Sequence, residues 1–140
     1  MEPPNHIWRC PTGEARDKLA ERFGFLNEPW MQDWEYQVAD HKRIDEFLKA
    51  YEFAGLSDDE KFTLMETIIE SFRDLASEGE DISADPRWQR ALAILSGNIP
   101  LHASTIWYWS CLDAENEDEM FCTSPFIRQI FEANRAYFAE

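Results

Sequence analysis

Hydrophobic residues recur every three or four positions along most of the chain, which is the spacing of amphipathic α-helices. The first stripe, Ala15, Leu19 and Phe23, follows a potential N-cap at Thr12 and ends at Gly24. No stretch shows the sustained alternation of a half-buried strand, and no Asn-Gly or Asp-Gly hairpin signal occurs. The pattern therefore predicts an all-α fold.

Two stripes lie between the first helix and Gly55. Asn27, followed by an early proline, predicts a helix start. Its apolar positions would be Trp30, Met31, Trp34 and Val38. A clear stripe follows at Ile44, Phe47, Leu48 and Tyr51. The sequence does not decide whether these two stripes form one bent helix or two helices.

The strongest local signal is the capping box Ser57-Asp58-Asp59-Glu60. In this motif the serine and glutamate side chains bond to each other's backbone N–H groups, and further acids favour the positive end of the helix dipole. The predicted helix runs from this motif to about Ala76. Its buried face would consist of Phe62, Met65, Ile69 and Phe72.

Three more helices are predicted in the C-terminal half. Asp85-Pro86 and Ser124-Pro125 each combine an N-cap residue with a proline at the first helical position, and Ile99-Pro100 leads into the middle helix. The last helix carries the stripe Ile127, Ile130, Phe131, Asn134 and Phe138. We therefore expect six or seven helices in one compact domain, residues 1–140, with bundle-like or short solenoid-like packing. An irregular arm, residues 1–11, would attach to the core through Ile7 and Trp8.

Four consecutive large residues, Ile106 to Trp109, occupy most of the circumference of one helix. One stripe contains Leu101, Thr105, Tyr108 and Leu112, and Ile106 and Trp109 extend it. At about 100° per residue, Trp107 and Trp109 point in directions about 160° apart around the helix axis. Burial as a central core helix is the favoured interpretation. The alternative is that one aromatic side chain is exposed as a binding anchor, a role common for Trp and Tyr at interfaces.

The acidic run Asp113 to Glu119 follows this aromatic block and contains five carboxylates and no cation. Taken alone, it is typical of an exposed loop that keeps a protein soluble. Residues 56–85 add ten acids against Lys61 and Arg73. The helix at 57–76 and the loop at 113–119 are therefore alternative acidic surfaces, and the sequence does not show whether they share a face.

The net charge of −15 favours solubility, and it also limits the kinds of partner that the protein can bind. It argues against direct binding to nucleic acid or an anionic membrane, since both attract positive surfaces. It favours rapid capture of a basic partner. The chain has no long apolar run and no signal-peptide pattern. Its three cysteines, Cys10, Cys111 and Cys122, are an odd number without the spacing of disulfide pairs. We therefore predict a cytoplasmic protein with reduced thiols.

Candidate chemistry is sparse. The three histidines, His6, His41 and His102, are far apart, and neither H-E-x-x-H nor C-x-x-C occurs. The acidic run lacks the glycine and glutamate positions of a calcium-binding EF-hand loop. No nucleophile motif or glycine-rich phosphate loop is present. We therefore expect no catalytic residue, no metal and no cofactor, and we interpret the cysteines as small buried residues.

Two features keep an enzyme as a third hypothesis. Glu66 and Glu70 fall on one helix face, which we interpret as a solvated side rather than an acid–base pair. His102 is interpreted as a core residue with a hydrogen bond or a capping role. An enzyme would instead require a deep pocket that holds His102 or His41 together with carboxylates.

The combination of small size, high acidity and an aromatic block beside an acidic run, HASTIWYWSCLDAENEDEMFCTSP, resembles the immunity proteins of bacterial toxin systems. The resemblance implies a cytoplasmic inhibitor that binds a basic toxin domain, commonly a nuclease, and blocks it. The expected contact residues are Asp113, Glu115, Glu117, Asp118, Glu119, Trp107 and Tyr108. The alternative is a non-catalytic regulatory or adaptor domain that binds another protein or peptide. Neither interpretation fixes the oligomeric state.

Overall fold

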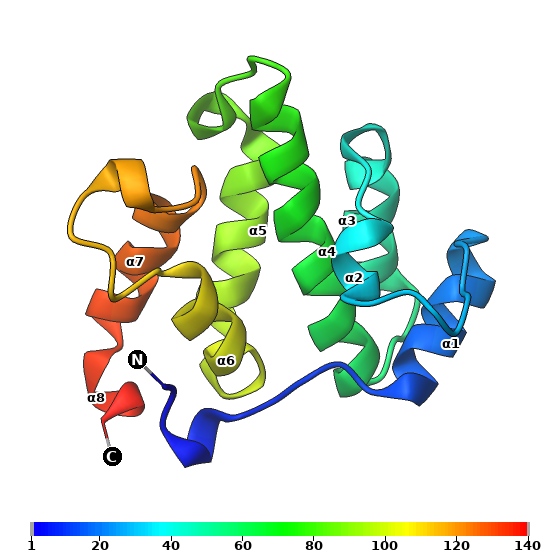
Figure 1. Ribbon diagram of the computed structural model, residues 1–140, viewed down its shortest axis with the longest axis horizontal. Helices are drawn as coiled ribbons and strands as arrows, with labels where there is room; N and C mark the ends of the chain where they lie inside the picture. The colour runs from blue at the N-terminus through cyan, green and yellow to red at the C-terminus, as the bar shows by residue number, and fades with distance from the viewer. Residues whose placement is uncertain (1, 140) are drawn as a thin grey trace. The chain divides into compact units, whose positions relative to one another are not determined.

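The computed structural model describes residues 2–139, and within them all regular structure is helical. Eight α-helices and four 3₁₀ turns are present in this part of the chain (Figure 1). The predicted all-α class is confirmed. Two of the α-helices, α2 (Trp34–Gln37) and α8 (Arg135–Phe138), have only four residues, which accounts for the excess over six or seven. No helix among the described residues has the length and apolar character needed to cross a membrane.

The residues form two compact units, which are described separately. The first unit is Cys10–Glu80, and the second combines Met1–Arg9 with Asp81–Glu140. The organisation of residues 1–140 as one domain remains a prediction. Residues 2–9 of the N-terminal arm belong to the second unit, where the 3₁₀ turn Asn5–Ile7 packs against α6. Ile7 is buried as expected, but Trp8 is 66% exposed, so the expected attachment through Trp8 is wrong.

The first unit is built around α4 (Asp58–Ser77), the long green helix of Figure 1. It packs against α1 (Gly13–Phe23), α2 and α3 (Ile44–Phe53). Residues 62–69 are all buried, because neighbouring helices contact α4 on more than one side. The capping box is confirmed: the Glu60 N–H donates to Ser57 Oγ at 3.2 Å, and the Ser57 N–H donates to Glu60 Oε1 at 3.1 Å.

The helix predicted to start at Asn27 is absent, and residues 24–33 form a loop instead. Arg16 on α1 explains the difference, since its Nε–H donates to Asn27 Oδ1 at 2.7 Å and its Nη2–H donates to the Glu28 carbonyl at 2.8 Å. The indole N–H of Trp34 donates to the Leu26 carbonyl at 2.7 Å. Asn27 therefore bonds to α1 rather than capping a helix. Only Trp34 of the first stripe lies in a helix, α2, whereas the whole second stripe lies in α3, and the 3₁₀ turn His41–Arg43 separates the two helices.

The second unit contains α5 (Pro86–Gly97), α6 (Ile99–Trp109), α7 (Ser124–Ala133) and α8. Helices α5, α6 and α7 pack against one another, and α8 packs on α7. Asp85 caps α5 as predicted by accepting a hydrogen bond from the Arg87 N–H. The predicted cap at Ser124 is wrong, because Ser124 is the first residue of α7 and is buried. The C-terminal stripe is divided between α7 and α8 at Asn134.

Candidate functional site

The aromatic block lies on α6, and its three rings lie in different environments. Trp109 is buried and its ring centroid lies 4.8 Å from that of Phe121. Trp107 is half-buried, and its ring centroid lies 5.9 Å from that of Phe131 on α7. Tyr108 is 49% exposed, although the stripe placed it on the buried side. α6 is therefore a core helix of its unit with one aromatic exposed to solvent, and the role of that aromatic as a binding anchor stays a prediction.

The acidic run forms a loop of defined conformation in the connection between α6 and α7 (Figure 1). Glu117–Glu119 make a 3₁₀ turn, which Asn116 caps by accepting a hydrogen bond from the Asp118 N–H at 3.0 Å. The Glu115 N–H donates to Glu119 Oε2 at 3.0 Å. These hydrogen bonds are all made within the run itself.

Arg128 on α7 holds the start of this loop. Its Nε–H donates to the Ser110 carbonyl at 2.8 Å, and its Nη2 donates to the carbonyls of Cys111 and Ala114, the latter at 3.1 Å. Cys111 has a φ of 48°, in the left-handed region, as the chain leaves α6. A charged guanidinium that bonds to three carbonyls in the same segment fixes the path of the backbone. This role could not be predicted from the sequence, because Arg128 lies 14 residues or more from its acceptors.

We name the exposed set formed by Tyr108 and the loop Asp113–Glu119 the acidic–aromatic surface. All five of its carboxylates are exposed, and no Lys, Arg or His among residues 2–139 forms an ion pair with them. The Tyr108 ring lies 5.8 Å from that of Phe121, two residues beyond the loop. Six of the seven predicted contact residues are therefore exposed around one connection, whereas Trp107 packs with the C-terminal helices. Their contact role remains a prediction.

The acidic helix α4 is a poorer candidate surface than its composition indicated. Glu66 is only 5% exposed and accepts a hydrogen bond from the Tyr36 hydroxyl at 3.3 Å. Partial burial also raises the pKa of Glu70 above its ordinary value. The interpretation of these two acids as a solvated side is therefore wrong for Glu66. Among the acidic residues of this helix only Asp58 and Asp59, in its first turn, are exposed, and the others are half-buried or buried.

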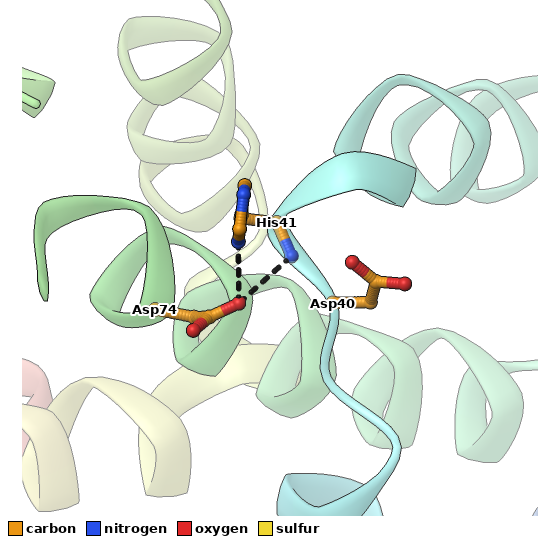
Figure 2. A group of neighbouring side chains, drawn as sticks. All are labelled: Asp40, His41 and Asp74. Atoms are coloured by element: carbon orange, nitrogen blue, oxygen red, sulfur yellow. Dashed lines mark hydrogen bonds and ion pairs between the residues drawn. The ribbon is translucent and has the colours of Figure 1, made fainter. Parts of the chain in front are cut away.

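A third group, Asp40, His41 and Asp74, was not found from the sequence, and Figure 2 shows it. One potential metal-ligand atom from each residue lies within 4.8 Å of the others. The His41 backbone N–H and ring Nδ1 both bond to Asp74 Oδ2, at 3.1 and 2.7 Å. Asp40 points away from this pair in Figure 2 and accepts a hydrogen bond from the Lys42 N–H. The group therefore links the 3₁₀ turn His41–Arg43 to α4, a contact across 33 residues.

Replacing Asp74 with Asn should lower the free energy of unfolding by about 1 kcal/mol near neutral pH, because the part-exposed bonds to His41 lose their charge. The hydrogen bond from His41 holds the pKa of Asp74 below its ordinary value. Its stabilisation is therefore present above about pH 4 and is lost as the pH falls further. Urea unfolding at about pH 7 and about pH 3 should show that the difference in free energy of unfolding between the wild type and Asp74→Asn is smaller at the lower pH. A difference equal at both pH values, or matched by the exposed control Glu21→Gln, contradicts this.

A polar pocket of about 260 Å³ lies beside the start of α1 and is lined by Pro11, Thr12, Gly13, Arg16, Asp33, Trp34 and Glu35. Burial, with the nearby charge of Asp33, raises the pKa of Glu35. No histidine lines this pocket, and His102 is fully buried in α6. This pocket therefore lacks the histidine that the enzyme hypothesis requires beside its carboxylates.

The cysteines differ from the prediction. Cys10 and Cys122 are exposed and Cys111 is half-buried, so their interpretation as buried apolar residues is wrong. None of these three cysteines forms a disulfide in the structure. Cys122 follows Phe121 at the end of the acidic loop, where the chain turns into α7.

Comparison with known proteins found no matching family model, no matching curated protein and no matching solved structure. The function is therefore argued from the residues of this chain and their arrangement.

Proposed function

We propose that this protein binds a basic protein partner through the acidic–aromatic surface, and that the partner is a toxin domain that it inhibits. The supporting observation is that a loop held in one conformation presents five exposed carboxylates that no cation of residues 2–139 pairs with. In a chain of net charge −15, this unpaired set is a strong local source of negative potential.

Each part of the surface has a distinct physical role in this proposal. The carboxylates attract and orient a positively charged partner, which raises the association rate more than the final affinity. Tyr108 offers a large apolar ring with a polar end, a common source of binding energy at the centre of interfaces. The hydrogen bonds that Arg128 donates and the one that Asn116 accepts order the loop before binding, so that little conformational entropy is lost in the complex.

The inhibitory role rests on the resemblance to immunity proteins. A basic enzyme that acts on nucleic acid needs its cations for the phosphate backbone. A surface of ordered carboxylates would occupy the same cations and exclude the substrate. The regulatory or adaptor alternative differs in that its partner would carry no toxic activity.

The test is affinity capture from the native host with three forms of the protein, washed at rising salt. The loop variant carries Asp113→Asn, Glu115→Gln, Glu117→Gln, Asp118→Asn and Glu119→Gln. The control variant removes the same charge from exposed sites elsewhere, through Glu2→Gln, Glu21→Gln, Glu28→Gln, Glu78→Gln and Glu80→Gln. We expect one basic protein on the wild type and the control variant but not on the loop variant.

The captured protein then tests the inhibitory role. Expressed alone in a surrogate host it should arrest growth, and co-expression of the wild type should restore growth while the loop variant does not. Equal capture by the loop variant and the wild type would exclude this surface. A captured basic partner without toxicity would leave binding intact and replace inhibition with the adaptor role.

A further inference from the structure

A groove of about 360 Å³ lies in the first unit, and its lining, unlike the acidic loop, includes positively charged residues. Helices α1 and α3 form it, and it is lined by Arg22, Phe23, Glu46, Lys49, Ala50, Phe53 and Ala54. The α3 residues recur at the three- and four-residue spacing of one helix face. Ala50, a small residue in the middle of that face, leaves room for another chain to approach the α3 backbone.

Phe53 gives this groove an apolar side chain with no role in the core. It is 74% exposed, more than Trp30 or Trp8, whereas Phe47 on the same helix is fully buried. An exposed phenylalanine at the edge of a groove loses no packing on binding and gains the burial of most of its ring. Large exposed apolar side chains gathered with a concave surface mark interaction sites.

The groove also has two cations without a partner. The chain holds 28 acids and only 13 Lys and Arg residues, so most cations should find a carboxylate. Lys18 does so with Glu14 at 3.2 Å, and Arg43 with Glu46 at 2.8 Å. Arg22 and Lys49 form no ion pair with any residue in 2–139. Because Arg43 already neutralises Glu46, the groove carries a local positive charge.

We propose that this groove binds an acidic amphipathic helix of a protein partner. A bulky apolar side chain of that helix would pack on Phe53 over Ala50, and flanking carboxylates would pair with Arg22 and Lys49. Two cations are too few for a membrane or a nucleic acid, both of which require a larger positive surface. A second copy of this chain is disfavoured because two molecules of charge −15 repel each other. The site is independent of the acidic–aromatic surface.

The first experiment identifies the class of ligand without assuming its sequence. A phage library of random peptides of about 16 residues, long enough for four helical turns, is selected on the wild type. Peptides that also bind a groove variant, Arg22→Glu with Lys49→Glu and Phe53→Ser, are discarded in each round. This depletion removes peptides that recognise the acidic loop, because the loop is unchanged in the variant. We expect sequences with excess Asp and Glu and apolar residues at helical spacing.

The second experiment measures one selected peptide by fluorescence polarisation. Binding should weaken at least about tenfold in Phe53→Ser and again in the charge-reversed pair, and it should persist in the loop variant. A matched control, Lys18→Glu with Lys42→Glu, reverses two exposed cations outside the groove and should change binding little. Selected peptides that are basic or neutral, or an equal loss in the control, would overturn the proposal.

Light scattering over a range of protein concentrations tests the alternative occupant. A dimer that forms in the wild type and is lost in Phe53→Ser would assign the groove to a second copy and overturn the partner helix. A monomer in both forms, together with selected acidic peptides, supports the proposal.

Discussion

Neutralising the five carboxylates of the loop is expected to slow association with the basic partner about 100-fold at low ionic strength. The loop variant retains two-thirds of the net charge, since −15 becomes −10. The expected loss therefore comes from the local field at the docking site rather than from the total charge. Stopped-flow association measured over a range of salt should show the wild-type rate falling steeply with salt and the loop-variant rate staying nearly flat.

The control variant separates local from global charge, because its net charge equals that of the loop variant. Its association rate should remain within about threefold of the wild type. An equal loss in both variants would mean that only total charge matters and would remove the loop as the contact site. Thermal unfolding of all three forms should agree closely, since exposed carboxylates without ion pairs contribute little to stability.

The local structure was predictable where a side chain bonds to its own neighbourhood. Thr12, Ser57 and Asp85 each accept a hydrogen bond from a backbone N–H two or three residues away, and each begins a helix as expected. Such caps depend on a few consecutive residues, so the sequence contains the whole interaction. The exposure of the acidic run was predictable for a related reason, since adjacent like charges repel and remain hydrated.

The failures occurred where a distant residue competes for the same group. Asn27 has the right side chain for a cap, but Arg16 and Asp17 bond to it instead. Glu66 was predicted to lie on a solvated helix side, yet it is buried in the first unit and its carboxylate bonds to Tyr36 from another helix. The angular spacing of residues around a helix also did not predict which aromatic of α6 would be exposed.

The candidate site shows the same division between local and distant signals. The five acids and Tyr108 were found from composition and order along the chain. Trp107 is half-buried against Phe131 and Phe138, which come from helices that the sequence could not place beside it, and its contact role remains a prediction. The contact between His41 and Asp74 gave no local signal at all.

Replacing Arg128 with Met is expected to cost about 3 kcal/mol of folding free energy, because a charged group bonds to three carbonyls and a hydrogen bond to a charged group contributes about 1.5–3 kcal/mol. Methionine keeps the apolar length of the side chain, so the loss reports on the guanidinium. The free energy of unfolding of Arg128→Lys should lie between those of the wild type and Arg128→Met, since an ammonium lacks the planar fork that reaches several acceptors. Urea unfolding measures the cost, and Gln129→Met, at the exposed neighbouring position, is the control.

The same substitution separates the order of the loop from its charge. The Glu115 and Asp118 amides donate to side chains within the loop, and their hydrogen exchange should accelerate when Arg128 no longer holds the preceding turn. The carboxylates are all retained, so partner association should keep most of its salt dependence. Affinity should still fall about tenfold, because the partner must now order the loop. Unchanged exchange with unchanged affinity would show that the local bonds alone maintain the loop, and Arg128 would then serve only to join α6 to α7.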